Sequence, residues 1–223
     1  VAHPTHYDTP LEGFKVIVNA GNGCGGFFAW DVLEKLGADT TGSLHLGPDG
    51  MFPNHMPNPE DATAMSLTRG AVLAGGADLG VVFDTGVDRS GMVDGVGAAI
   101  NRGRLIALIS AIVLGEHPGM TVVTDTWSGD WLTWFIEARS GRRLQQRGRQ
   151  GHASQRGRRE DAHHGGDLET TRHGALRQNH FLDDCAYMMV KIIIQKVRMR
   201  LAVLEGRVGS LIRDLEDPDR VCL

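Results

Sequence analysis

The chain has 223 residues, of which 41% are hydrophobic, and a formal net charge of −4 at pH 7. This length is enough for one or two domains with a hydrophobic core, and the slight acidic excess gives no indication of a nucleic-acid partner. The longest apolar stretch, residues 105–114, falls well short of the ~20 residues that span a membrane. We therefore expect a globular protein that binds neither nucleic acid nor membrane.

The cysteines point to a reducing compartment. Cys24, Cys185 and Cys222 are widely spaced and odd in number, which argues against a disulfide framework. We therefore expect the cytoplasm or an organellar stroma. The first residue is Val1 and no signal-peptide pattern follows it, so we expect that the natural N-terminus lies upstream and that any targeting segment is not visible. The sequence gives no oligomeric state.

The chain begins with a polar stretch, residues 1–12, that is predicted to be a linker. A strand over residues 14–18 then leads through a glycine-rich turn, residues 19–26, into a helix over residues 27–36. Backbone N–H groups at such a helix start favour anions, but the spacing fits neither a dinucleotide fingerprint nor a Walker loop. A plain tight turn is the favoured interpretation, and residues 43–46 are expected to form a short strand.

Residues 48–60 are expected to form an ordered loop, because four prolines and an Asp-Gly pair exclude a helix or a central strand. His55 in this loop is a candidate ligand. Its favoured role is structural, since the loop needs side chains to satisfy its own backbone. The acidic pair at the end of the loop favours the start of a helix over residues 60–74, which two glycines terminate.

The next segment contains candidate metal-binding and phosphate-binding residues. An apolar run, residues 79–83, predicts a buried strand, and Asp84, Asp88 and Arg89 follow it directly. In an open α/β sheet, ligands bind just beyond the carboxyl ends of the strands. Carboxylates there can hold a hard cation such as Mg²⁺, and a guanidinium can pair with a phosphate through two hydrogen bonds. The residues indicate a magnesium and phosphate site, with a polar turn as the alternative.

The alternation of strands and helices continues beyond this loop. A hairpin is expected over residues 92–100 and a buried helix over residues 104–114. Residues 13–118 therefore form one alternating unit, which implies a sheet covered on both faces. A second unit begins with a strand over residues 120–124 and a helix over residues 130–138.

Residues 140–167 interrupt this pattern. They are rich in arginine, glutamine, glycine and histidine and almost lack apolar side chains, so they cannot bury enough surface to offset their ordering entropy. We interpret them as disordered or aberrant, for example as the product of a shifted reading frame. A basic arm for RNA is the alternative, which the absence of interleaved aromatic residues disfavours. A long helix is expected over residues 181–204.

Several of these segments, in this order, resemble the α-D-phosphohexomutases, the phosphomannomutase/phosphoglucomutase family. Residues 84–89, D-T-G-V-D-R, match the family's metal signature D-x-D-x-D-R, with Gly86 in place of the central aspartate. Residues 19–23 resemble D-x-G-N-G, and residues 52–60 match F-P-x-H-x-P-N-P-E. Residues 169–175, E-T-T-R-H-G-A, resemble the sugar-specificity loop E-x-S-G-H-G-A.

The resemblance implies an α/β fold of two consecutive three-layer α/β/α phosphohexomutase-type domains, the second irregular or incomplete. Domain II, with the metal loop, is expected over residues 13–118. Domain III, with the sugar loop, is expected over residues 119–205. Residues 206–223 then correspond to the start of a linker to a fourth domain.

The resemblance also implies a Mg²⁺-dependent isomerase, an intramolecular phosphotransferase of carbohydrate metabolism. It moves a phosphoryl group between the 1- and 6-positions of hexose phosphates, which are the expected binding partners. The implied metal ligands are Asp84 and Asp88, the implied catalytic residues are Arg89 and His173, and the implied substrate-binding residues are Glu169, Thr171 and His173.

Two departures from the family pattern predict that this chain is inactive alone. Gly86 removes one of three carboxylate ligands, so Mg²⁺ is expected to bind more weakly. No run like the family's phosphoserine loop T-S-S-H-N-P is present. The alternatives are a non-catalytic sugar-phosphate-binding fragment and a degraded gene product.

Overall fold

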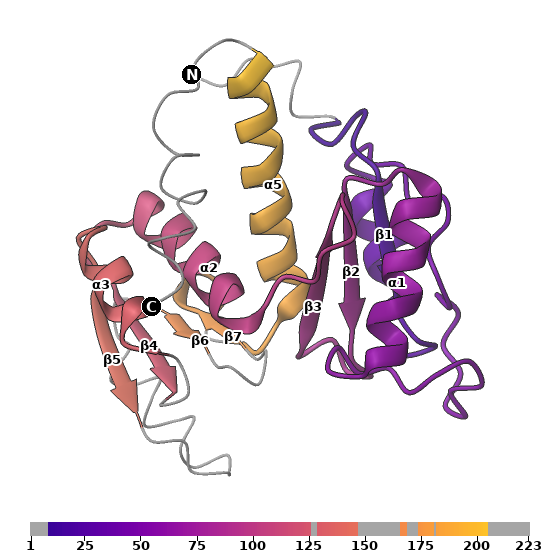
Figure 1. Ribbon diagram of the computed structural model, residues 1–223, viewed down its shortest axis with the longest axis horizontal. Helices are drawn as coiled ribbons and strands as arrows, with labels where there is room; N and C mark the ends of the chain where they lie inside the picture. The colour runs from indigo at the N-terminus through magenta and orange to yellow at the C-terminus, as the bar shows by residue number, and fades with distance from the viewer. Residues whose placement is uncertain (1–8, 126–128, 147–165, 169–173, 181, 205–223) are drawn as a thin grey trace.

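The computed structural model describes residues 9–125, 129–146, 166–168, 174–180 and 182–204. Helices pack against two small sheets that follow one another along the chain (Figure 1). No helix in these ranges is long and apolar enough to cross a membrane. The architecture is the α/β class that the sequence predicts.

The first sheet has the strand order β1-β2-β3, formed by Val16–Asn19, Leu79–Phe83 and Ser90–Asp94. β1 pairs with β2 in parallel, and β2 pairs with β3 antiparallel. The segments between β1 and β2 include a short π-helix, η2, at Phe28–Leu33 and the helix α1 at Ala62–Gly75. β2 is thus the central strand, and it is buried throughout.

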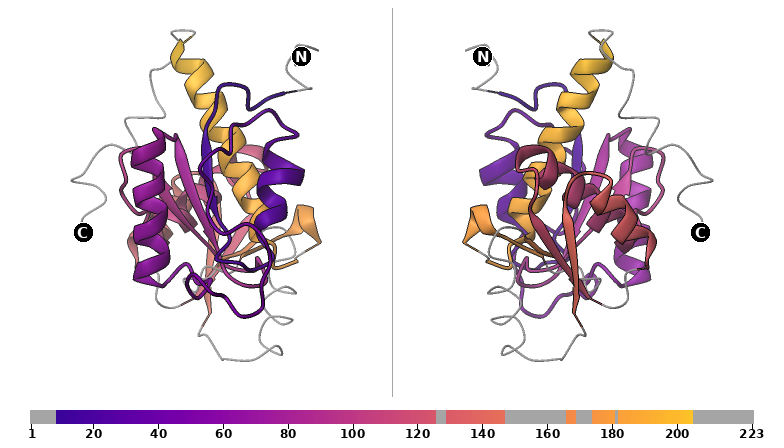
Figure 2. Two further views of the ribbon diagram at one scale, coloured as in Figure 1. Left: turned by 90° about the vertical axis from the view of Figure 1, so that its right-hand side faces the viewer. Right: turned by 90° about the vertical axis from the view of Figure 1, so that its left-hand side faces the viewer.

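The two faces of this sheet are covered by different helices. Ile17 faces α1, where it packs with Val72 and Val93, whereas its neighbours Val16 and Val18 point to the opposite face and join the main core. Figure 2 shows α1 on one side of the strands, with η2 and the last helix on the other. Alternate side chains of a buried strand therefore contact two helical layers, as expected for a three-layer unit.

The second sheet has the order β5-β4-β6-β7. β4 is Thr121–Asp125, and it pairs in parallel with β5 at Arg142–Gln146 and with β6 at Gly166–Leu168. β7, Gly174–Leu176, pairs antiparallel with β6. This sheet is less regular than the first, because β6 and β7 each have only three residues.

The described residues contain three further α-helices and one 3-10 turn. α2 spans Arg102–Glu116, α3 spans Trp131–Glu137 and α5 spans Cys185–Leu204, while η3 is the short turn Arg177–Asn179. α2 packs against both α3 and α5. One buried apolar cluster runs from the first sheet through α2 and α5 to the second sheet, so the two halves share a core.

The expected strand over residues 79–83 and the expected helix over residues 60–74 are confirmed. The helix begins after Asp61, whose Oδ1 accepts hydrogen bonds from the backbone N–H groups of Thr63 (2.7 Å) and Ala64 (3.1 Å). It ends at Gly76, which adopts the left-handed conformation with φ 58°. Local capping chemistry sets these boundaries, which explains why the sequence predicts them.

The expected strand over residues 43–46 is wrong. Within the described part of the chain, the only β pairing of this segment is a single parallel bridge between Asn19 and Leu44. Nearby, His45 adopts a positive φ of 51°, which is incompatible with extended backbone. The chain therefore touches the edge of β1 and turns away from it.

The expectation that residues 140–167 are disordered is wrong at both ends of the segment, whereas their interpretation as aberrant stays a prediction. Residues 142–146 form β5 and residues 166–168 form β6, while residues 147–165 lie outside the described part of the chain. Arg143 serves a structural purpose: its guanidinium donates to Thr124 Oγ1 (2.8 Å), Thr133 Oγ1 (2.7 Å) and the Gly129 carbonyl (3.0 Å). An arginine-rich strand is stable here because its neighbours supply acceptors.

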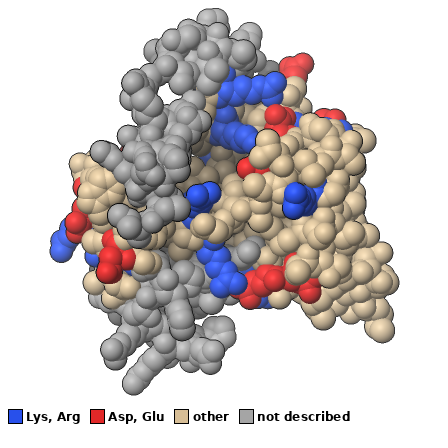
Figure 3. Space-filling view, viewed as in Figure 1, with Lys and Arg blue, Asp and Glu red and all other residues tan. Residues whose placement is uncertain are grey.

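Two further predictions from the sequence stay predictions. One is the division into domains at residue 118. The other is the absence of a nucleic-acid partner. On the face seen in Figure 3, acidic and basic side chains of the described residues are interspersed.

The close approach of α1 to β2 makes a testable prediction. A Cβ at Gly80 would lie 2.7 Å from the methyl carbons of Thr68 and Val72 on α1. Gly80→Ala should therefore overpack this contact and lower the free energy of unfolding by about 1–3 kcal/mol, measured by urea denaturation.

Gly70→Ala is the matched control. Gly70 lies on the exposed face of α1 with nothing within 4 Å of a Cβ, so the same substitution should stabilise the helix by about 0.5–1 kcal/mol. Equal stabilities of the Gly80→Ala variant and the parent would contradict the packing described here.

Candidate functional site

The candidate site lies where β2 ends. Residues 84–89, called here the aspartate loop, connect β2 to β3. Because β1 and β2 are parallel, the glycine-rich turn after β1 lies at the same edge of the sheet. The Cys24 N–H donates to the Thr85 carbonyl (3.0 Å), and a Cβ at Gly23 would lie 3.0 Å from the Thr85 Cα. The turn therefore packs directly on the aspartate loop.

Asp84 and Arg89 close the aspartate loop on itself. The Asp84 N–H donates to the Arg89 carbonyl (3.2 Å), and the Arg89 N–H donates to Asp84 Oδ1 (3.1 Å). Arg89 Nε donates to Asp84 Oδ2 (3.2 Å). Asp84 is only 4% exposed, so these bonds satisfy a carboxylate that is largely shielded from water.

The environment of Asp84 favours its ionised form. Burial alone raises the pKa of this carboxyl group, but a side-chain hydrogen bond with Asp88 and the hydrogen bonds and positive charge of Arg89 together hold its pKa below the ordinary value. The site therefore contains a negative charge at neutral pH, paired with the Arg89 guanidinium.

The Arg89 guanidinium has N–H donors beyond the one that binds Asp84. Its Nε is held by Asp84, and its side chain is 30% exposed. The hydrogen bonds and ion pairs found among the described residues do not use its two terminal nitrogens. Those nitrogens are the pair that binds a phosphate through two parallel hydrogen bonds. Asp84 thus orients an arginine that can receive an anion.

The aspartate loop has the type of ligand that a hard cation prefers, carboxylate oxygen, but it has fewer carboxylates than the family signature. Asp84 and Asp88 supply oxygen ligands, yet no group of three potential ligands from His, Cys, Asp and Glu exists among the described residues. A Cβ at Gly86 would lie 3.7 Å from Asp88 Oδ1, an ordinary contact. The loop therefore has space for a third carboxylate at the position where the sequence lacks one.

The loop at residues 48–60 supports the glycine-rich turn. His55 Nε2 lies 3.0 Å from Asn19 Oδ1, and His55 Nδ1 lies 2.9 Å from the Met56 carbonyl. Asn19 in turn donates from Nδ2 to Thr68 Oγ1 (3.0 Å) on α1. The expected structural role of His55 is confirmed, because both of its ring nitrogens are engaged in holding the turn.

The predicted sugar-binding residues lie outside the described residues. Glu169, Thr171 and His173 fall in the range 169–173. Their flanks are described, since Leu168 at the end of β6 pairs with Gly174 at the start of β7. The structure therefore tests neither the position of these residues nor their distance from the aspartate loop.

Sequence reasoning missed one residue that touches the aspartate loop. Cys185, the first residue of α5, is fully buried and donates from Sγ to the Asp88 carbonyl (3.0 Å). The two residues are 97 positions apart in the chain. No local pattern could indicate this contact, because it depends on how α5 packs against the first sheet.

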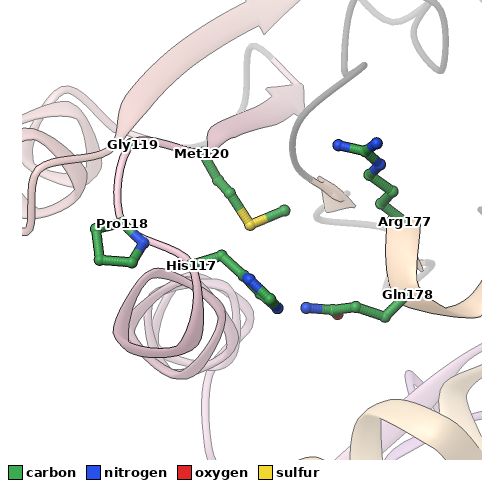
Figure 4. Close-up of a pocket in the computed structure, with 6 residues that line it drawn as sticks. All are labelled: His117, Pro118, Gly119, Met120, Arg177 and Gln178. Atoms are coloured by element: carbon green, nitrogen blue, oxygen red, sulfur yellow. The ribbon is translucent and has the colours of Figure 1, made fainter.

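A surface hollow of about 550 Å³ lies away from this site. It is lined by His117, Pro118, Gly119, Met120, Arg177 and Gln178, and Figure 4 shows the His117 and Gln178 side chains pointing toward each other across it. The Gln178 amide is buried and makes no hydrogen bond within the described part of the chain. The hollow adjoins the start of β4, whereas ligands of such sheets bind at the ends of the strands.

Comparison with known proteins finds a family model that matches part of the chain and relatives that match most of it. Residues 5–97 match the family model described as phosphoglucomutase/phosphomannomutase, alpha/beta/alpha domain II. The chain is 32% identical over 214 residues to a phosphomannomutase of Salmonella montevideo, covering 92% of this chain and 44% of that protein. It is 35% identical over 139 residues to a phosphomannomutase/phosphoglucomutase of Pseudomonas putida, covering 62% and 29%. The chain thus spans less than half the length of these relatives.

Two solved structures superpose on most of the chain. A phosphoglucomutase/phosphomannomutase family protein from Burkholderia thailandensis superposes with a TM-score of 0.77 at 25% identity, covering 89% of this chain and 43% of that chain. A putative phosphomannomutase from Thermus thermophilus superposes with a TM-score of 0.68 at 13% identity, over 88% of this chain and 46% of that one. Because the sequence identity to the second structure is only 13%, this superposition shows a similar fold and nothing about function.

The charge pair in the aspartate loop makes a pH-dependent prediction. The folded-state pKa of Asp84 lies below its unfolded value, so its ionisation stabilises the fold above the ordinary pKa of ~3.9 and ceases to do so as the pH falls through the folded-state value. Asp84→Asn should cost about 1–3 kcal/mol at pH 7, and the difference from the parent should narrow below about pH 4.

Urea denaturation at several pH values measures this difference. Glu137→Gln removes one negative charge from an exposed position on α3 and should leave the stability nearly unchanged. An Asp84→Asn variant as stable as the parent at pH 7 would show that the pair does not hold the loop.

Proposed function

We infer that the chain belongs to the phosphoglucomutase/phosphomannomutase family, and we propose from this premise that it supplies the metal-binding and sugar-binding parts of a Mg²⁺-dependent phosphohexomutase. The proposed reaction moves a phosphoryl group between the 1- and 6-positions of a hexose phosphate in carbohydrate metabolism. The observation that carries the proposal is the aspartate loop, in which a buried carboxylate orients a partly exposed arginine at the end of a central strand.

Arg89 is proposed to bind the phosphoryl group that is transferred. Its Nε is fixed by Asp84, so the terminal nitrogens can meet phosphoryl oxygens without first being ordered. Negative charge on those oxygens is what such a site has to stabilise during phosphoryl transfer. His173 is proposed to assist proton transfer, and Glu169 and Thr171 to bind sugar hydroxyls, on the strength of the family motif that residues 169–175 resemble.

Asp84 and Asp88 are proposed as the Mg²⁺ ligands of this chain. Bound Mg²⁺ would supply positive charge against the phosphoryl oxygens. Two carboxylates hold such an ion less firmly than three, and the position of the third is occupied by Gly86. We therefore expect weak Mg²⁺ binding, and we expect that the main role of Asp84 is to hold Arg89 through their ion pair.

The isolated chain is proposed to be inactive, because Gly86 removes one of the three carboxylates of the metal signature that residues 84–89 resemble. The alternative function is non-catalytic binding of sugar phosphates, which Gly86 favours because a weak metal site impairs phosphoryl transfer more than it impairs substrate binding.

Among the described residues, Cys24 and Cys185 are free thiols, which supports the proposed location in a reducing compartment, the cytoplasm or an organellar stroma.

The metal proposal is tested by restoring the missing carboxylate. Gly86→Asp places an oxygen ligand where the loop has space for it, so Mg²⁺ should bind at least about tenfold more tightly than to the parent, measured by titration calorimetry.

Gly50→Asp adds the same charge at an exposed glycine outside the aspartate loop, with no atom near a Cβ, and it should leave Mg²⁺ affinity at the parent level. Equal Mg²⁺ affinities of the Gly86→Asp and Gly50→Asp variants would contradict the assignment of the loop as a metal site.

The sugar-phosphate proposal is tested by binding and turnover together. Saturation-transfer NMR should detect glucose 1-phosphate on the parent, and Glu169→Ala should abolish the signal, while Glu137→Ala on the exposed face of α3 should not. A coupled assay should find no conversion of glucose 1-phosphate to glucose 6-phosphate.

Turnover by the purified chain would overturn its proposed inactivity. Absence of sugar-phosphate binding, with or without Mg²⁺, would overturn both the mutase and the non-catalytic binding proposals. Binding that is independent of Mg²⁺, including in Gly86→Asp, would favour the non-catalytic function.

A further inference from the structure

The middle of the aspartate loop has an unfavourable backbone conformation. Val87 adopts a φ of 65°, in the left-handed region that β-branched residues rarely enter. Such a conformation persists only where the surrounding structure holds it in place. Val87 is 7% exposed, so the contacts that hold it come from the protein.

The contacts between Asp84 and Arg89 fix only the ends of the loop. On one side, the Cys24 N–H holds the Thr85 carbonyl. On the other, Cys185 makes two contacts with consecutive carbonyls: its N–H donates to Val87 O (3.1 Å) and its Sγ donates to Asp88 O (3.0 Å). One residue of α5 thus binds the part of the loop that is strained.

These two carbonyls belong to the two peptide planes that flank Asp88. The Val87 carbonyl lies in the peptide that joins residues 87 and 88, and the Asp88 carbonyl lies in the next one. When both planes are held, the backbone dihedrals of Asp88 are fixed, because a residue has only these two soft rotations. The direction of its Cβ, and hence of its carboxylate, then follows.

Cys185 is well suited to this task. As the first residue of α5, its N–H has no acceptor within the helix, and the Val87 carbonyl supplies one. Its side chain is 0% exposed, and its Sγ lies 3.0 Å from the Asp88 carbonyl oxygen. The thiol is therefore enclosed by protein where it makes this contact and is protected from oxidation.

We propose that Cys185 is a positioning residue for Asp88, holding the strained Val87–Asp88 backbone so that the Asp88 carboxylate has a fixed direction in which it would bind a cation. The part of this claim that concerns the cation rests on the proposed function. The positioning itself does not, since it follows from contacts within the protein. It makes the metal site of the first sheet dependent on a helix from the second half of the chain.

Hydrogen exchange without metal tests the positioning. Cys185→Ala removes the Sγ donor, so the amides of Asp84 and Arg89, which close the loop, should exchange several-fold faster, while core amides such as that of Val81 keep their protection. Cys185→Ser keeps a donor and should restore most of the protection. Cys24→Ala, which keeps its backbone bond and changes an exposed side chain, should have no effect.

Titration with Mg²⁺ in the Gly86→Asp chain tests the consequence for the cation. Cys185→Ala should weaken Mg²⁺ binding about three- to tenfold, the effect of one net hydrogen bond. The loss should be smaller when Val87 is also changed to Gly, because glycine adopts a positive φ without penalty. A merely structural cavity would cause the same loss in both backgrounds.

The two measurements separate the two claims. Unchanged exchange in Cys185→Ala, or faster exchange throughout the core, would overturn the positioning role. Faster exchange confined to the loop, in a Gly86→Asp chain that binds no Mg²⁺, would support the positioning role while the proposed metal function fails. Unchanged Mg²⁺ affinity in Cys185→Ala, in a chain that does bind the ion, would overturn the link to the cation.

Discussion

The site depends on the parallel pairing of β1 with β2. Their register, from Val16 opposite Leu79 to Asn19 opposite Val82, brings the carboxyl ends of both strands to one edge of the sheet. The glycine-rich turn after β1 can therefore pack against the aspartate loop after β2, with the Cys24 N–H bonded to the Thr85 carbonyl. The contacts between the turn and the loop follow from that juxtaposition, because short loops reach only what lies at their own edge.

The second half of the chain adds what the first sheet lacks. α5 crosses the first sheet along its length, with Cys185 at the aspartate loop and Lys196 donating to the Asp78 carbonyl just before the start of β2. Arg200 forms an ion pair with Asp78 (3.6 Å) one turn further on. A helix that belongs to the second half thus supports both ends of β2. The geometry of the aspartate loop therefore depends on contacts from both halves of the described chain.

The sequence predicts those parts of the fold that local chemistry decides. β2 has an unbroken apolar run, and α1 has Asp61 at its start and glycines at its end, so both were predictable. β5 was not, because Arg143 is satisfied by acceptors on β4 and α3 that no local pattern reveals. Asp84 and Arg89 follow the apolar run of β2 directly in the sequence, so their place at the end of that strand was predictable. The place of Cys185 was not, because the packing of a distant helix puts it there.

The central claim is that the aspartate loop, at the end of the central strand β2, is a cation and phosphate site. The most direct measurement is a titration of the isotope-labelled chain with Mn²⁺ in the presence of glucose 1-phosphate, observed by NMR. The account predicts paramagnetic broadening that begins at the amides of Asp84, Asp88 and Arg89. Broadening centred on another part of the chain, or none at millimolar Mn²⁺, would contradict it.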